Sequence, residues 1–344
     1  MKKPKLKYLM LCIILAVLLL LSIILCLNFG AMKISFTHTY QIIWERIRGI
    51  DPRESTIGLS EFNIVWKMRM PRVIMGIAVG AGLALCGTVM QAAVQNPMAE
   101  PYVLGISSGA SLGATFSIFL GMSMLTPFCA FFGSILATAA VLLLASYGSK
   151  ATSTKLVLSG TIVNALFSAI SNFIISMSGD SEGVMTIKFW TMGSLTKADW
   201  DNIAIPFGIV IICTIFFMSQ YRILNSMLLG DEAAITLGIS LPRYRMLYMG
   251  ICALLTGVLV ASCGIIGFVG LMIPHIFRAI VGSDHRYLIP VSVLSGSIFM
   301  VWADAFARSA VKNSELPIGI ITALVGAPFF AYILIRKNYR FGTD

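Results

Sequence analysis

Residues 95–114, QNPMAEPYVLGISSGASLGA, hold the most chemically suggestive cluster in the chain. The segment GISSG (105–109) fits G-x-S-x-G, the pattern of a serine nucleophile at a strand–turn–helix junction. Such a serine also needs a base within hydrogen-bond reach. The histidines, His38, His275 and His285, are scattered, and apolar runs rather than a strand flank the segment. The sequence therefore disfavours catalysis, and the small residues suit close helix packing or a pathway wall equally well.

Metal, disulfide and nucleotide chemistry find little support. The chain has seven cysteines, each in or at the end of an apolar run, and no two form C-x-x-C. This pattern favours buried free thiols over a disulfide framework or a zinc site. No G-x-x-x-x-G-K-[ST] segment occurs in the sequence. We therefore expect no catalytic residue, no metal and no cofactor bound by this chain.

The elements that must position these residues are apolar. Hydrophobic residues make up 58% of the chain and charged residues 12%, whereas about a quarter of a soluble domain is charged. The run YLMLCIILAVLLLLSIILCL is longer than a signal-peptide core and no clear A-x-A site follows, so we expect a retained first span. In such a chain the net charge of +10 favours cations at anionic lipid over nucleic-acid binding.

Apolar runs of this length without period-2 alternation predict helices, because a backbone in lipid must satisfy its own hydrogen bonds. The expected fold is an all-α polytopic membrane protein with about ten transmembrane helices in a single domain, residues 1–344. The predicted spans lie near 8–28, 71–92, 103–120, 125–147, 155–177, 202–219, 244–263, 266–281, 287–307 and 317–335.

An even number of spans places both termini on one side of the membrane. The short loops at 148–155, 220–243 and 282–287 carry lysine or arginine, which favours the cytoplasmic side for them. Both termini are therefore predicted to be cytoplasmic. The cations between Lys33 and Arg72 then lie outside, against this tendency, and need a separate explanation.

Two X-Pro steps interrupt the chain after the second span. Asn96-Pro97 and Glu100-Pro101 cannot lie inside a regular helix, because proline lacks a donor and disfavours the helical conformation in the residue before it. We predict a break there, at the cytoplasmic end of the span. Elsewhere, GIAVGAGLALCG and GIIGFVG repeat small residues at close spacing, which indicates tight packing between helices rather than a ligand site.

Five blocks then stand out: RMPRVIMGIAVGAGLALCGTVMQAAVQNPMAEPYVLGISSGASLGA (69–114), LLGDEAAITLGIS (228–240), GIIGFVGLMIPHIFRAIVGSDHR (264–286), ADAFARS (303–309) and ELPIGIITALVGAPFFAYIL (315–334). In these blocks the chain resembles the FecCD/BtuC-like permease subunits of type II ABC importers, which take up iron–siderophore complexes, haem and vitamin B12. The blocks cover nearly the whole chain, whereas the first span and its outer loop match only in character.

The resemblance implies a transport subunit rather than an enzyme, in the bacterial cytoplasmic membrane. Two permease subunits, identical or related, would sit beneath an extracytoplasmic substrate-binding protein and above two separate ATPase subunits that bind ATP-Mg. Ferric siderophore is the expected cargo, with haem and vitamin B12 as alternatives. No nucleic acid is expected as a partner, and the lipid bilayer surrounds the assembly.

The resemblance also assigns roles to the loop at 220–243, where the family contacts its ATPase. The residues implied are Gly230, Asp231, Glu232, Ala233, Leu237 and Gly238. Acids at a helix start complement the dipole, and a glycine can end a short helix. Read without the resemblance, the segment is an ordinary surface turn.

Three arginines, Arg69, Arg72 and Arg308, match the positions at which the family docks binding-protein carboxylates. A planar guanidinium suits that pairing because it can donate two parallel bonds. Arg308 has a competing partner, since Asp304 lies four residues earlier in the sequence. For Arg69 and Arg72 the alternative is snorkelling to the interface.

The translocation pathway and its inner gate are implied in three places. The gate residues are Asn96, Pro97 and Met98 in one loop, with Ser153 and Thr154 in TSTK as the matching candidates in another. The candidate pathway residues are Ser107, Ser108 and Asn164. Asn164 and Asn172 each need an inward face, which a pathway or an interhelical hydrogen bond would satisfy equally.

An ion-driven secondary transporter is the alternative from another class. Such a protein favours acidic residues at mid-membrane for ion coupling. Asp304 is the one carboxylate inside a predicted span, and it lies toward the outer end.

Overall fold

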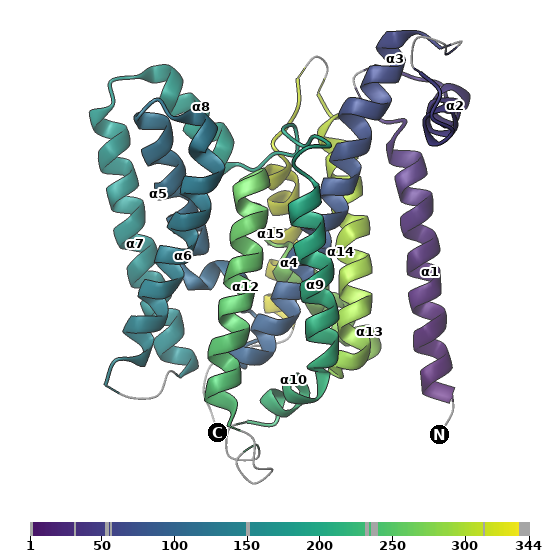
Figure 1. Ribbon diagram of the computed structural model, residues 1–344. Helices are drawn as coiled ribbons and strands as arrows, with labels where there is room; N and C mark the ends of the chain where they lie inside the picture. The colour runs from purple at the N-terminus through teal and green to yellow at the C-terminus, as the bar shows by residue number, and fades with distance from the viewer. Residues whose placement is uncertain are drawn as a thin grey trace.

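The computed structural model describes residues 3–30, 32–51, 55, 57–148, 152–230, 234, 240–311 and 314–336. These residues form a helical bundle (Figure 1). Six helices are long and apolar enough to cross a membrane, a bent pair adds a seventh, and three further apolar helices are shorter. Together they occupy the ten predicted segments, and the all-α polytopic fold is confirmed.

The helices within the predicted spans keep the expected order. They are α1 (Lys3–Cys26), α4 (Met70–Ala93), α5 (Ile106–Phe119), α6 (Thr126–Ser146), α7 (Ser153–Met177), α9 (Ala204–Ser219), α12 (Leu241–Cys263), α13 (Val269–Val281), α14 (His285–Ala307) and α15 (Ile318–Arg336). The additional elements are α2 (Phe36–Ile47), α3 (Leu59–Asn63), the π-helix η1 (Ile64–Arg69), the 3-10 helices η2 (Pro101–Leu104) and η3 (Ser123–Leu125), α8 (Ser181–Thr191) and α10 (Tyr221–Leu228).

The two ends of the bundle carry different short helices. The lower end, as drawn in Figure 1, holds the start of α1 and the helix α10. The upper end holds α2, α3 and α8. Helix α10, which begins the predicted cytoplasmic loop, thus lies at the same end as the start of α1. The side of the membrane that this end faces stays a prediction.

Helix α4 is the centre of the bundle. Its apolar window is 89% buried, whereas that of α1 is 17% buried. Glycines set the distance to its neighbours: a Cβ on Gly80 would lie 2.1 Å from the Gly296 carbonyl oxygen of α14, and one on Gly87 would lie 1.7 Å from that of Gly270 in α13. The small residues of GIAVGAGLALCG therefore pack helices together, as predicted.

A second group of helices, α5 to α8, lies on the opposite side of α12 from α14 (Figure 1). Here α5 packs tightly on α6, because a Cβ on Gly109 or Gly113 would lie 2.2 or 2.0 Å from a carbonyl oxygen of α6. Close packing therefore accounts for Gly109 and Gly113, whereas Gly105 adopts a left-handed conformation with φ of 76°.

The spans differ from their predicted form in two places. Helix α4 continues a helical run from Leu59, and the six-residue π-helix η1 ends two residues before Pro71. A π-helical turn is one way to accommodate a proline that cannot donate to the preceding turn. Helices α9 and α10 form the bent pair, with an angle of 64° between them. The segment predicted as a loop after residue 219 therefore begins with a helix.

Candidate functional site

The predicted gate loop follows directly from the end of α4. Gln95 adopts a left-handed conformation with φ of 53°, and the Asn96 side chain then accepts a 2.9 Å hydrogen bond from the Met98 backbone N–H. An asparagine that bonds its own backbone two residues on stabilises a tight turn. Met98 is exposed, and Asn96 and Pro97 are partly exposed. The three predicted gate residues thus form one exposed turn at the lower end.

This turn is tied to α10. The Gln95 side-chain amide donates a 2.7 Å hydrogen bond to the carbonyl oxygen of Met227. The Arg245 guanidinium of α12 donates a 2.6 Å bond to the carbonyl oxygen of Ala93, in the last turn of α4. Leu224 and Met227 are fully buried. Helix α10 therefore contacts the turn that follows α4, while α12 holds the last turn of α4 itself.

A second set of bonds joins α10 to the start of α14. The Asn225 side-chain oxygen accepts bonds from the His285 backbone N–H at 2.9 Å and pairs with its ring Nδ1 at 2.8 Å. The Asn225 amide donates to Asp284 Oδ1 at 2.8 Å. Asp284 also caps α14 by accepting from the Arg286 N–H. We call these three residues, Asn225, Asp284 and His285, the α10 latch.

The predicted ATPase contact lies almost wholly outside the described residues. This applies to Asp231, Glu232, Ala233, Leu237 and Gly238. Gly230 is described and has a φ of 94°, a conformation that favours glycine. The next described residue, Ala234, is buried and donates a hydrogen bond to the Gly230 carbonyl oxygen. The coupling assignment therefore stays a prediction.

Helix α7 carries an exposed polar stripe along its length. Thr154, Thr161, Ser168 and Asn172 are all exposed. At 3.6 residues per turn they fall within an arc of about 40°. Apolar side chains occupy the adjacent exposed face, namely Ile162, Leu166 and Phe173. An exposed polar stripe and an exposed apolar face therefore lie next to each other on this helix.

The remaining predicted pathway residues lie apart from that stripe. Asn164 is partly buried, and its side-chain oxygen has no hydrogen-bond partner among the described residues. Ser108 is buried and donates to the Gly105 carbonyl oxygen, whereas Ser107 is partly exposed. The side chain of Ser153 is outside the described residues. Of the predicted set, only Thr154 is placed on the α7 stripe.

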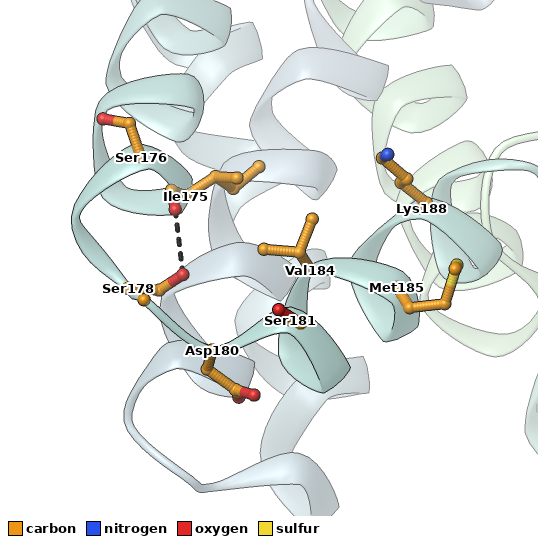
Figure 2. A pocket seen from close by; sticks show the side chains of 9 residues that line it. Ile175, Ser176, Ser178, Asp180, Ser181, Val184, Met185 and Lys188 are labelled. Atoms are coloured by element: carbon orange, nitrogen blue, oxygen red, sulfur yellow. Dashed lines mark hydrogen bonds between the residues drawn. The ribbon is translucent and has the colours of Figure 1, made fainter.

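A hollow of about 410 Å³ lies at the upper end, where α7 turns into α8 (Figure 2). Ser178 shapes the turn by donating to the Ile175 carbonyl oxygen at 2.8 Å, and Asp180 caps α8 through the Glu182 N–H. Lys188 faces the hollow from the other side. The hollow is wide open, so a second surface would have to cover it to enclose a ligand.

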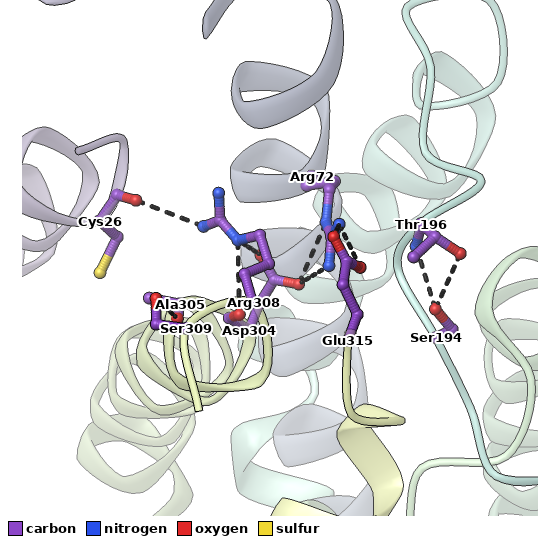
Figure 3. Close-up of polar contacts among 9 residues, drawn as sticks. All are labelled: Cys26, Arg72, Ser194, Thr196, Asp304, Ala305, Arg308, Ser309 and Glu315. Carbon is purple, nitrogen blue, oxygen red and sulfur yellow. Dashed lines mark hydrogen bonds and ion pairs between the residues drawn. The ribbon is translucent and has the colours of Figure 1, made fainter. Parts of the chain in front are cut away.

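Two of the predicted docking arginines, Arg72 and Arg308, form a charge cluster with Asp304 and Glu315 at the upper end (Figure 3). Arg72 pairs with Asp304 Oδ1 at 2.9 Å and with Glu315 Oε2 at 2.8 Å. Arg308 pairs with the other oxygen of Asp304, also at 2.9 Å. Asp304 is 1% exposed, whereas the Glu315 side chain is 41% exposed. One carboxylate thus holds two guanidinium groups in place.

Two of the predicted docking arginines also hold the end of α1. Arg308 donates to the Cys26 carbonyl oxygen at 3.3 Å, and Arg69 donates to those of Leu27 and Met32. The last carbonyls of a helix lack internal partners and favour nearby cations. All three arginines therefore have partners within the chain, including the Asp304 pair anticipated for Arg308. Their docking role stays a prediction.

Several contributors to these sites escaped the sequence analysis. Gln95 donates to the Met227 carbonyl oxygen, and Asn225 accepts from the His285 backbone N–H. Glu315 bonds Arg72, which lies 243 positions earlier in the sequence. Glu315 carried one available signal, because it is an isolated acid immediately before an apolar run.

Comparisons with known proteins agree with this architecture. The model of the FecCD transport family matches residues 18–336. The chain is 38% identical to the uncharacterized ABC transporter permease protein YvrB of Bacillus subtilis (strain 168) over 331 residues, which cover 93% of this chain and 92% of the relative. It is also 38% identical to the cobalamin import system permease protein BtuC of Halobacterium salinarum over 279 residues, 80% of this chain and 74% of the relative.

One solved structure is similar over nearly its whole length. It belongs to a transporter assigned to the metal-chelate ABC type, in an inward-facing conformation. The TM-score is 0.80 at 31% sequence identity, and the match covers 94% of this chain and 98% of that one. The helical arrangement described above is therefore the arrangement of an ABC transporter subunit.

Proposed function

Because the chain belongs to the FecCD transport family, we propose that it is the membrane-spanning permease subunit of an ATP-driven importer. It is a multi-pass protein of the cytoplasmic membrane. The observation that carries the proposal is the full-length similarity to a solved ABC transporter of the metal-chelate type. In this proposal ATP-Mg binds to two separate ATPase subunits, and a substrate-binding protein delivers the cargo at the upper end.

The proposed cargo is a metal held in a bulky organic ligand, with ferric siderophore first and haem or vitamin B12 as alternatives. The names of two similar proteins support this class, since one refers to a metal chelate and the other to cobalamin. Uptake of labelled ferric siderophore, haem and cobalamin, compared in one host, distinguishes the three.

The proposed coupling route begins at the loop 220–243 and passes through α10. Its support is the set of bonds from α10 to Gln95 beside the gate turn and to Asp284 and His285 at the start of α14. An ATPase that displaces the loop would therefore pull on two transmembrane helices at once. Gly230 supplies the left-handed turn from which the coupling segment departs.

The proposed pathway runs along the polar stripe of α7. Exposed hydroxyl and amide groups in lipid have no water to bond, so such a stripe favours a wet cavity or a protein neighbour. We place the second permease subunit opposite this face, with Thr154 near the inner gate and Asn172 along the wall. The hollow beside α8 then opens toward the same cavity.

Docking of the binding protein on Arg69, Arg72 and Arg308 needs a change at the charge cluster. Arg72 bonds Glu315, and that carboxylate is the exposed member of the cluster. A carboxylate of the arriving protein can replace Glu315 at Arg72 without unpairing Asp304. This exchange is the form of docking that the geometry favours.

Ion-driven transport gains no support from the site. Asp304, the carboxylate considered for ion coupling, is bonded to Arg72 and Arg308 and is almost fully buried. A carboxylate held by two arginines is a poor exchangeable ion site, because its charge is already compensated.

The first test is affinity purification of the chain in mild detergent from its own host. We expect an ATPase with a Walker motif to co-purify with the unaltered chain and to be lost from the Asp231→Lys/Glu232→Lys variant, because reversed charge opposes the proposed contact. Asp180→Lys/Glu182→Lys, an equal charge change at the upper end, is the control and should retain the ATPase. Absence of any ATPase even after crosslinking would refute the importer assignment.

The α10 latch gives a second prediction. Asn225→Ala removes the bonds to Asp284 and His285, and we expect transport in reconstituted vesicles to fall roughly tenfold, equivalent to about 1.4 kcal/mol. ATPase binding and hydrolysis should persist, since the proposed contact is untouched. Ser226→Ala is the matched control, because the Ser226 hydroxyl donates to the Arg222 carbonyl oxygen within its own helix. Equal transport by the two variants would exclude the latch from coupling.

A further inference from the structure

Helix α2 packs on the protein with only one of its faces. Thr39, Ile42 and Glu45 are buried on that face. Ile42 joins a small hydrophobic cluster that also includes Phe62 and Val65 of the run leading into α4. The helix lies at the edge of the bundle, near the upper end of α1 (Figure 1). Its packing therefore fixes which way the opposite face points, namely away from the bundle.

That opposite face is apolar and exposed. Phe36, Tyr40, Trp44 and Ile47 are 52%, 42%, 55% and 71% exposed. At 3.6 residues per turn they fall within an arc of about 80°. We call these four residues the α2 aromatic stripe. An apolar stripe turned away from the protein is unfavourable in water, so the surroundings of α2 are not simply aqueous.

Cations border the stripe. Lys33, Arg46 and Arg48 are exposed. The Arg48 guanidinium lies over the Trp44 ring at 4.5 Å from its centroid, and that of Arg46 lies 5.7 Å from the centroid of Trp66. Guanidinium groups held beside aromatic rings match the boundary where lipid phosphates meet acyl chains.

The position along the chain identifies the lipid surface as the partner. Helix α1 is an apolar span that exposes most of its surface and ends at Cys26, ten residues before α2 begins. The link between them continues the apolar exposure through Phe29 and Met32, which are 43% and 42% exposed. Tyrosine and tryptophan are enriched where spans emerge from the bilayer. The stripe thus lies where the lipid-facing surface of α1 meets water.

We propose that α2 is an interfacial helix that inserts the α2 aromatic stripe into the headgroup–acyl boundary of the bilayer at the upper end. Lys33, Arg46 and Arg48 face the lipid phosphates. The helix anchors the upper end of α1 from outside the bundle, while Arg69 and Arg308 hold it from within. Part of the cationic segment between Lys33 and Arg72 then has a lipid partner. The proposal is independent of the cargo and of the ATPase.

The test places nitroxide spin labels on a cysteine-free background in lipid nanodiscs containing phosphatidylglycerol. Tyr40→Cys puts the label on the stripe, and His38→Cys puts it outside the stripe, beside Glu61, where the His38 side chain is 47% exposed. We expect the label at position 40 to collide more often with oxygen and several-fold less often with a water-soluble nickel chelate than the label at position 38. Equal nickel accessibility at the two sites would overturn the proposal.

Two further readings complete the test. A label at position 40 that is immobilised and shielded from both reagents would show that a protein covers the stripe, which also overturns the proposal. A chain whose only tryptophan is Trp44 avoids any perturbation of Tyr40. Its fluorescence should be quenched more strongly by lipids brominated near the headgroup than by lipids brominated near the bilayer centre, and absence of quenching by either would contradict insertion.

Discussion

Replacement of Asp304 by alanine is expected to destabilise the folded chain by about 3–5 kcal/mol, the cost of removing one partner from a buried charge group. Asp304 bonds both Arg72 and Arg308, and all three residues are at most 6% exposed. The substitution leaves two guanidinium groups facing each other without an anion between them. Thermal unfolding in detergent, followed by loss of monodisperse protein, measures the effect.

Two variants separate charge pairing from packing at this cluster. Glu315→Gln changes a carboxylate that is 41% exposed, so we expect a loss of about 1 kcal/mol or less. The triple variant Arg72→Met/Asp304→Leu/Arg308→Met removes Asp304 and both arginines paired with it, and should recover most of the stability lost by Asp304→Ala. If the triple variant is no more stable than Asp304→Ala, unpaired charge is not the cause.

Substitution of Gly87 by valine is expected to lower stability by about 3 kcal/mol, at the upper end of the usual cost of overpacking. A Cβ there would lie 1.7 Å from the Gly270 carbonyl oxygen, so α4 and α13 must separate. The new atoms would meet backbone on the facing helix, and no side-chain rotation can relieve the clash. The measurement is the thermal midpoint together with the yield of folded protein.

The matched control is Gly250→Ala in α12. A Cβ at Gly250 meets no atom within 4 Å, so this substitution adds helix propensity without a clash. We expect its thermal midpoint to equal or slightly exceed that of the unaltered chain. A comparable loss in both variants would mean that the spacing of α4 and α13 does not limit stability.

The transmembrane helices were predictable because a backbone in lipid must satisfy its hydrogen bonds within a helix or a closed barrel. Long apolar runs must be helical, and glycines at close spacing must meet neighbouring backbones. Helices α2, α3 and α8 were missed because they lie outside the apolar runs, where composition alone does not distinguish a short helix from a loop. The bend between Ser219 and Tyr221 was missed for a related reason, since neither proline nor glycine marks it.

The candidate site was predictable only where its partners are near in sequence. The pair formed by Asp304 and Arg308 was anticipated from a four-residue spacing. The pair between Arg72 and Asp304 forms only because α4 and α14 pack side by side, and a single sequence does not indicate which helices are neighbours. The bond from Gln95 to the Met227 carbonyl oxygen is harder still, because a backbone acceptor has no side-chain signature.

Helix α4 is fastened at both of its extremities. At the upper end, Arg72 forms an ion pair with Asp304 of α14. At the lower end, the carbonyl oxygen of Ala93 accepts a hydrogen bond from Arg245 of α12. Between these two points, Gly80 and Gly87 bring the α4 backbone against the backbones of α14 and α13. Helix α4 is therefore held against three neighbours along its length, so we expect it to move together with α12, α13 and α14 rather than to bend alone.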